Sequence, residues 1–223
     1  MLGRMIKFVA FDMDGVLTDC KSSWYFIHKH FGTDNMKNIE LYNNGIIDYP
    51  TFVYLDVKLW LDKKPDLKIH DLVEIYKKMP LMKNAKETVD ELKRMGIKVA
   101  ILTGGLDILA KIVGEKIGID EYYANGLKTY DDGRLTGEGI IRINPYHKDD
   151  VLKKIMDERN LKRNEVAVVG DGEVDIPMFK LVETSIAFDP ITEEVEKNAK
   201  YVIKEKDLKL ILPIIQKSSQ NHQ

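Results

Sequence analysis

Short runs of apolar, β-branched and aromatic residues recur along the chain and end at polar or glycine-containing turns. The first run, Ile6–Phe11, is almost wholly apolar, which is typical of a strand buried on both faces of a parallel sheet. Three later runs share this character, and a fourth is weaker. The expected strands are Ile6–Phe11, Val99–Leu102, Val166–Val169, Ser185–Phe188 and Tyr201–Ile203.

Amphipathic helical patterns lie between these expected strands. In Asn84–Met95 the apolar residues form one stripe, and Gly96 is predicted to cap the C-terminus of this helix. Leu106–Ile117 and Asp149–Arg159 repeat the pattern. Strands that alternate with helices favour an α/β fold, a Rossmann-like, doubly wound parallel sheet.

Two stretches depart from this alternation. Tyr122–Ile143 holds β-rich segments around an Asp-Gly pair, which predicts an antiparallel hairpin at one end of the sheet. Residues 22–79 are helical in pattern throughout, are rich in aromatic residues and lie between the first and second expected strands. We therefore expect an α/β core, residues 1–21 and 80–223, with a helical cap, residues 22–79, inserted after the first strand.

Composition and charge narrow the class of protein. The chain has 223 residues, of which 44% are hydrophobic, and a formal net charge of -2. A charge this close to zero argues against a nucleic-acid partner. The longest early apolar run has about six residues, against roughly 20 for a membrane span, so no membrane partner is expected. With a single cysteine, Cys20, and no targeting segment, a cytoplasmic location is the expectation.

Asp12 and Asp14 follow the first expected strand and are followed by Gly15. Two carboxylates two residues apart, leaving a strand, can face the same side. One carboxylate can then act as a nucleophile towards phosphorus and the other as an acid and base. Alternatives are surface acids at a strand end or a calcium loop. The calcium-loop pattern fails because its glycine and its distal glutamate are missing at the required spacing.

Two further positions suit a phosphate. Thr103 and Gly104 follow the second expected strand, where a hydroxyl and backbone N–H groups can hold phosphate oxygens. A plain helix cap is the alternative there. Lys148 lies near the start of an expected helix and offers a point charge for a phosphate, although a solvated surface lysine is the ordinary interpretation.

Asp171 follows the expected strand Val166–Val169, and Asp175 lies about one helical turn further on. Magnesium prefers oxygen ligands and takes one or two protein carboxylates besides a substrate phosphate. Asp171 with Asp12 meets that need. Asp175 can hydrogen-bond to the site or pair with Lys148, or it can simply cap a helix.

These motifs, in this order, resemble the haloacid dehalogenase superfamily of aspartate-nucleophile phosphatases. The matching residues are Asp12-Met13-Asp14-Gly15-Val16-Leu17-Thr18, Thr103, Lys148, and Gly170-Asp171 with Asp175.

The resemblance implies a role for each of these positions. Asp12 attacks phosphorus, and Asp14 protonates the leaving group and then activates water. Magnesium is bound by the carboxylates of Asp12 and Asp171 and by the backbone carbonyl of Asp14. Thr103, the Gly104 amide and Lys148 hold the phosphoryl group.

Within the superfamily the chain looks most like the phosphoserine phosphatase branch, from motifs such as Tyr123-Ala124-Asn125 and Gly170-Asp171-Gly172. It departs from that branch in the cap. Lys21 stands where a glutamate reads the amino group of the substrate, and Leu59 where an arginine reads its carboxylate. Lys21 would instead meet a second acidic group on the substrate. Four aromatic residues of the cap are interpreted as cap core rather than as pocket lining: Trp24, Tyr25, Phe26 and Tyr54.

The expected function is hydrolysis of a small phosphorylated metabolite, with Mg²⁺ as cofactor and a phospho-aspartate intermediate. A phosphotransferase or phosphomutase on the same core is an alternative, because the cap selects the acceptor. A non-catalytic binding protein is a third, although it would be expected to lack one of Asp12, Asp14, Lys148 or Asp171. The sequence leaves the oligomeric state and the substrate open.

Overall fold

The computed structural model describes residues 5–220, so the two ends of the predicted core, residues 1–4 and 221–223, lie outside the described part. Within it, seven strands form one sheet in the order β4-β3-β2-β1-β5-β6-β7. All neighbouring strands are parallel except β3 and β4, which form the predicted antiparallel hairpin. The strands are β1 (Phe8–Phe11), β2 (Lys98–Leu106), β3 (Tyr122–Thr129), β4 (Leu135–Ile140), β5 (Val166–Gly170), β6 (Thr184–Phe188) and β7 (Tyr201–Ile203).

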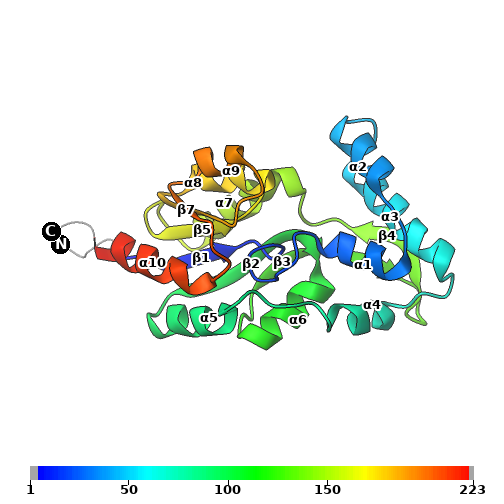
Figure 1. Ribbon diagram of the computed structural model, residues 1–223, viewed down its shortest axis with the longest axis horizontal. Helices are drawn as coiled ribbons and strands as arrows, with labels where there is room; N and C mark the ends of the chain where they lie inside the picture. The colour runs from blue at the N-terminus through cyan, green and yellow to red at the C-terminus, as the bar shows by residue number, and fades with distance from the viewer. Residues whose placement is uncertain (1–4, 221–223) are drawn as a thin grey trace.

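Helices cover both faces of this sheet (Figure 1), which confirms the predicted doubly wound α/β fold. Side chains alternate along β1: Phe8 and Ala10 pack into one hydrophobic cluster, and Val9 and Phe11 into another. The first cluster lies under α7 (Lys148–Glu158), α8 (Ile176–Leu181) and α9 (Glu193–Asn198). The second lies under α5 (Ala85–Arg94), α6 (Asp107–Ile117) and α10 (Ile211–Gln220). No helix in the described part of the chain has the length and apolar composition needed to cross a membrane.

Four helices lie between β1 and α5, and they are called the inserted helices below: α1 (Ser23–Phe31), α2 (Met36–Asn43), α3 (Tyr49–Lys63) and α4 (Ile69–Tyr76). The chain leaves and re-enters the core along paired backbone segments, because Asp19 N–H donates to the Pro80 carbonyl and Met82 N–H to the Leu17 carbonyl, at 3.0 and 2.9 Å. α3 packs on β4, and α4 packs against α6. The insertion therefore rests on one end of the sheet (Figure 1).

The order in which the chain adds strands to the sheet reverses at the central strand, β1. From β1 the chain proceeds to β2 and β3 on one side and later to β5, β6 and β7 on the other. In open α/β sheets this switch leaves a crevice beyond the carboxyl ends of the strands. Residues that follow β1 and β5 directly, Asp12 and Asp171, therefore lie beside one another at this crevice.

A buried carboxylate joins three of the inserted segments. Asp56, on α3, is fully buried. It accepts hydrogen bonds from Asn35 Nδ2 and Asn38 Nδ2, each at 2.7 Å, and its Oδ2 lies 3.1 Å from His28 Nε2. Trp60 Nε1 in turn donates to His28 Nδ1 at 3.1 Å. A charge buried in this way is tolerated because its oxygens are satisfied, and the network ties α1 and α2 to α3.

Replacement of Asp56 by alanine should lower the free energy of unfolding by about 3 kcal/mol, because the substitution leaves several buried donors without an acceptor. Urea unfolding followed by circular dichroism measures the change. Asp62→Ala, an exposed position on the same helix, is the matched control. Equal unfolding midpoints for the two variants would show that the network does not stabilise the insertion.

Candidate active site

One cavity, of about 290 Å³, collects most of the residues that the sequence singled out. Asp12 follows β1, Asp171 follows β5, and Lys148 is the first residue of α7. Thr103 and Gly104 lie within β2 rather than in a loop before the next helix, because β2 continues to Leu106. All five residues line this cavity together with Asp14 and Lys21.

Gly15 allows the chain to turn away sharply after Asp14. Its φ is +73°, a left-handed conformation that side chains with a Cβ rarely adopt. A Cβ at this position would also overlap the carboxylate of Asp171. The glycine therefore allows the loop after β1 to pass directly against the residue that follows β5.

Lys148 is a buried cation between two carboxylates. Its side chain is 1% exposed, and Nζ lies 3.1 Å from Asp12 Oδ1 and 2.5 Å from Asp175 Oδ1. Burial alone would lower the pKa of Lys148, but the charges of Asp12 and Asp175 outweigh it and raise that pKa above its usual value. Lys148 is therefore charged throughout the neutral range.

Asp175 contacts both Lys148 and the backbone that follows β5. Its Oδ2 accepts hydrogen bonds from the backbone N–H groups of Asp171 and Gly172, at 3.0 and 3.1 Å. Its Oδ1 faces Lys148. Both oxygens are thus engaged by the protein. Asp175 therefore positions Asp171 and Lys148 and is not itself free to react with a substrate.

Asp12 is oriented by two contacts on one oxygen. Oδ1 accepts a hydrogen bond from Met13 N–H at 2.8 Å and faces Lys148. Burial, and then the charge of Asp175, raise the pKa of Asp12 well above its ordinary value, and Lys148 opposes this rise. Burial likewise raises the pKa of Asp171 to about 7. Such crowding of carboxylates is relieved by a cation.

Oxygen atoms of Asp12, Asp171 and Asp175 lie within 4.8 Å of one another, close enough to share an ion. A donor set made only of oxygens suits hard divalent cations. Because Asp175 is already engaged by Lys148 and two amides, Asp12 and Asp171 are the carboxylates that fit a metal.

Asp14 differs from its neighbours in having one oxygen held and one oxygen unpartnered. Ser23 donates to Oδ2 through both its backbone N–H and its hydroxyl, at 2.8 and 2.7 Å. Asp14 Oδ1 is buried and has no hydrogen-bond partner among the described residues. Burial raises the pKa of Asp14, while the bonds from Ser23 lower it. A carboxyl with a raised pKa and an unengaged oxygen suits proton transfer.

Lys21 lies at the edge of the same cavity, where it contacts two acidic residues. Its Nζ is 3.0 Å from Asp171 Oδ2 and 2.9 Å from Asp189 Oδ2, and it donates to the Asp189 carbonyl at 2.5 Å. The predicted contact of Lys21 with an acidic group of a substrate stays a prediction. Such a group would compete with these two carboxylates.

The inserted helices line the cavity differently from the sequence-based interpretation. Leu59 packs against the hydrophobic core and is not among the lining residues, so the predicted correspondence with a substrate-reading arginine gains no support. Trp24 lines the cavity, whereas Tyr25 and Tyr54 are exposed elsewhere, so the assignment of the latter two to the cap core was wrong. The reason is helical register, which the aromatic content alone does not determine.

Three residues that position the site were missed as functional residues. Ser23 holds Asp14, as described above. Tyr49 OH donates to the Gly104 carbonyl at 2.9 Å, and Asn125 Nδ2 donates to the same carbonyl at 3.1 Å. Asn125 Oδ1 also accepts from the N–H groups of Arg142 and Ile143, at 2.8 and 2.9 Å. The sequence signalled Asn125 only as part of the Tyr123-Ala124-Asn125 motif and gave it no role of its own.

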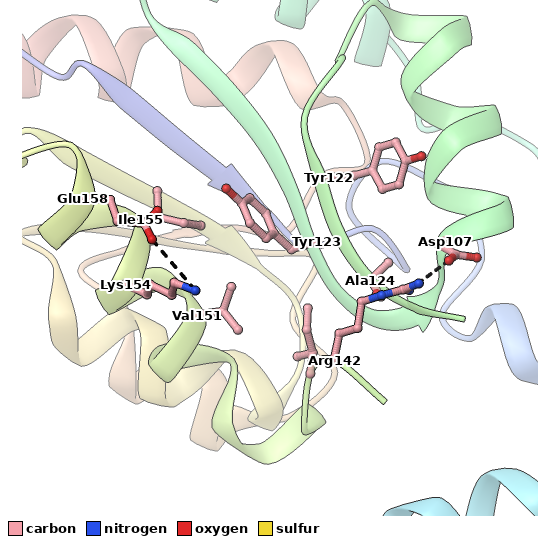
Figure 2. A pocket seen from close by; sticks show the side chains of 10 residues that line it. Asp107, Tyr122, Tyr123, Ala124, Arg142, Val151, Lys154, Ile155 and Glu158 are labelled. Atoms are coloured by element: carbon pink, nitrogen blue, oxygen red, sulfur yellow. Dashed lines mark hydrogen bonds and ion pairs between the residues drawn. The ribbon is translucent and has the colours of Figure 1, made fainter. Parts of the chain in front are cut away.

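A second cavity, of about 500 Å³, lies between α7, β3 and the start of α6 (Figure 2). Val151 and Ile155 line one side of it, and the ion pair of Arg142 with Asp107, at 2.9 Å, lies on the other. Its charged side chains form ion pairs with one another, as Lys154 and Glu158 do at 3.8 Å. Although it is larger, none of the carboxylates that follow β1 and β5 lines it, so the smaller cavity is the candidate active site.

The fold and the convergent acids define an α/β enzyme that handles a phosphoryl group, and comparison with known proteins agrees. A model of the haloacid dehalogenase-like hydrolases matches residues 6–182. The phosphoserine phosphatase of Methanocaldococcus jannaschii is 37% identical over 154 residues, 67% of this chain and 71% of that protein. That of Campylobacter jejuni is 31% identical over 215 residues, 95% of this chain and 100% of that protein.

Solved structures are similar as well. A phospho-aspartyl intermediate analogue of phosphoserine phosphatase has 29% identity and a TM-score of 0.79, covering 94% of this chain and 99% of that chain. A substrate-bound phosphoserine phosphatase complex has the same identity and TM-score, covering 94% and 98%. The chain belongs to the haloacid dehalogenase-like hydrolase family, and within it the chain is a phosphoric monoester hydrolase.

Replacement of Asp175 by asparagine should lower kcat about 10- to 100-fold, because an amide would face Lys148 in place of a carboxylate and would hold Asp171 less firmly. Steady-state hydrolysis of 4-nitrophenyl phosphate measures the change. Asp150→Asn, at an exposed position on α7, serves as the control. A kcat within twofold of the wild-type value would contradict the positioning role of Asp175.

Proposed function

We propose that this protein is a magnesium-dependent phosphatase of a small phosphorylated metabolite, with Asp12 as the nucleophile. The observation that carries the proposal is the convergence of Asp12, Asp14 and Asp171 on one cavity, beside a buried lysine 3.1 Å from Asp12 Oδ1. A phosphoryl group needs a nucleophile, a proton donor and positive charge at one point, and this cavity contains residues for each.

The reaction proceeds in two displacements. In the first, a carboxylate oxygen of Asp12 forms a bond to phosphorus while the ester P–O bond breaks, and Asp14 transfers its proton to the departing alkoxide. In the second, Asp14 removes a proton from water, which attacks the same phosphorus and releases inorganic phosphate with the free carboxylate of Asp12. The raised pKa of Asp14 favours the protonated form that the first displacement needs.

Positive charge is supplied from two sides. Mg²⁺, when bound to Asp12, Asp171 and the backbone carbonyl of Asp14, would neutralise the phosphoryl oxygens and orient them. Lys148 contributes a permanent charge, and Thr103 and the Gly104 amide hold the phosphoryl group from β2. The Gly104 peptide is fixed for this role because Tyr49 and Asn125 both donate to its carbonyl.

We propose further that residues 22–79 act as a cap over a core of residues 1–21 and 80–223. The hydrogen bonds that connect cap and core at the cavity include those from Tyr49 OH to the Gly104 carbonyl, at 2.9 Å, and from Tyr146 OH to Asn43 Oδ1, at 3.1 Å. A cap in this position excludes bulk water during phosphoryl transfer and admits small metabolites in preference to folded phosphoproteins. The cytoplasmic location stays a prediction.

Phosphate release from 4-nitrophenyl phosphate should require Asp12. Replacement by asparagine removes the nucleophile but keeps the size and the Met13 contact, so we expect at least a ~10³-fold loss of kcat. Asp19→Asn, at an exposed position seven residues on, is the control. Chelation of the metal should abolish the wild-type activity, and added Mg²⁺ should restore it. Residual turnover by the Asp12 variant near the wild-type rate would exclude a phospho-aspartate on this residue.

Lys21 should weaken metal binding, since its ammonium lies 3.0 Å from Asp171 Oδ2 and repels an arriving divalent cation. We expect Lys21→Met to lower the Kd for Mg²⁺ about three- to tenfold, a range set by the partial exposure of the side chain. Isothermal titration calorimetry on metal-free protein measures this directly, with Lys58→Met, on the exposed face of α3, as the control. An unchanged or larger Kd would mean that Lys21 does not oppose the metal.

A further inference from the structure

The wall that the inserted helices present to the catalytic cavity is aromatic. Trp24, Tyr42, Tyr49 and Phe52 all line it, and Tyr146 completes it from the core. Tyr42 is the centre of this group: its ring centroid lies 5.5 Å from that of Tyr49, 5.3 Å from that of Phe52 and 5.8 Å from that of Tyr146. These five residues are called the aromatic wall below.

Two of the hydroxyl groups on the aromatic wall are already engaged within the protein. The Tyr49 hydroxyl donates to the Gly104 carbonyl and the Tyr146 hydroxyl to Asn43 Oδ1. A substrate therefore meets the ring faces and edges of these two tyrosines rather than free hydroxyl groups. Ile39 adds an aliphatic side chain to the same side of the cavity.

Charged side chains in the cavity are confined to the end where phosphorus reacts. Among the residues that line it, the charged ones are Asp12, Asp14, Lys21, Lys148 and Asp171. Lys21 and Lys148 each contact two acidic residues, as described above. The leaving group of a bound ester, which points away from these residues, has no charged partner on the aromatic wall.

The charged residues lie at one end of the cavity, and the aromatic wall lines the part that would receive the leaving group. We therefore propose that the natural substrate is a phosphomonoester of an uncharged aromatic or bulky apolar alcohol. The proposal rests on the proposed function and specifies the substrate class of the same site. An apolar leaving group gains free energy by leaving water for the aromatic wall. The leaving group of phosphoserine carries an ammonium and a carboxylate, which would lose their hydration here without gaining partners of opposite charge.

Three alkyl esters test the proposal: 2-phenylethyl phosphate, ethyl phosphate and phosphoserine. All three release an alkoxide from a primary carbon, so differences in kcat/KM report chiefly on the contacts of the leaving group. With Mg²⁺ present, we expect 2-phenylethyl phosphate to exceed both other esters by at least about tenfold in kcat/KM. Phosphocholine, whose cationic group could also bind to aromatic rings, completes the panel.

Variants test whether the preference for 2-phenylethyl phosphate arises from the aromatic wall. Tyr42 is half-buried and lies on α2, a helix without buried residues, so Tyr42→Ala is expected to fold. This variant should lose most of the ratio between 2-phenylethyl and ethyl phosphate, whereas Tyr42→Phe should keep it. Tyr25→Ala, at a cap tyrosine that is 60% exposed and outside the cavity, should leave the ratio unchanged.

Hydrolysis of phosphoserine or phosphocholine with a higher kcat/KM than 2-phenylethyl phosphate would overturn this inference while leaving the proposed phosphatase intact. So would a ratio that Tyr42→Ala does not change. If none of the esters, nor 4-nitrophenyl phosphate, releases phosphate in an Asp12-dependent reaction, the proposed function itself fails, and the substrate class falls with it.

Discussion

The site depends on one buried cation among crowded carboxylates. The parallel pairing of β1 with β5 brings Asp12, Asp171 and Asp175 to one point, where their charges repel one another. Lys148 lies between Asp12 and Asp175 with its side chain 1% exposed, and it compensates part of this charge. An isolated buried charge of either sign would be costly. The remaining excess of negative charge is what makes the site receptive to a divalent cation.

This electrostatic centre also determines how the surrounding backbone is held. Asp175 connects Lys148 to the amides that follow β5, and Gly15 lets the loop after β1 approach Asp171. Across the cavity, the Gly104 carbonyl receives bonds from Tyr49 of the inserted helices and from Asn125 of β3. Movement of the insertion is therefore linked through Tyr49 to the peptide that we propose to hold phosphate, so cap closure and phosphate binding are expected to favour each other.

The sequence was sufficient to predict the strands of the sheet and the positions of the acidic residues that follow them, because both depend on local patterns. Buried strands are recognisable by their apolar runs, and Asp12 and Asp171 are recognisable because each directly follows one. The pairing of Lys21 with Asp189 joins residues that are distant in the chain, and no local pattern predicts it. Likewise β2 continues through Thr103 and Gly104 to Leu106, although its pairing with β3 is irregular between Leu102 and Leu106, and the low strand propensity of glycine gives no local signal for this continuation. The position of Leu59 relative to the cavity was not predictable, because a helical segment without a motif leaves its register open.

Catalysis and specificity thus rest on different parts of the chain and on different physical interactions. Around phosphorus, charges and hydrogen bonds are supplied mainly by residues at strand and helix ends, whose positions are fixed by the sheet. Around the leaving group, contacts come mainly from rings on α1, α2 and α3, which are joined to one another by Asp56 and ring packing. Substitutions in the aromatic wall can therefore change which alcohol fits without disturbing Asp12, Lys148 or Asp171. For this reason similarity to known phosphatases in the core supports phosphomonoester hydrolysis, whereas the substrate must be argued from the aromatic wall.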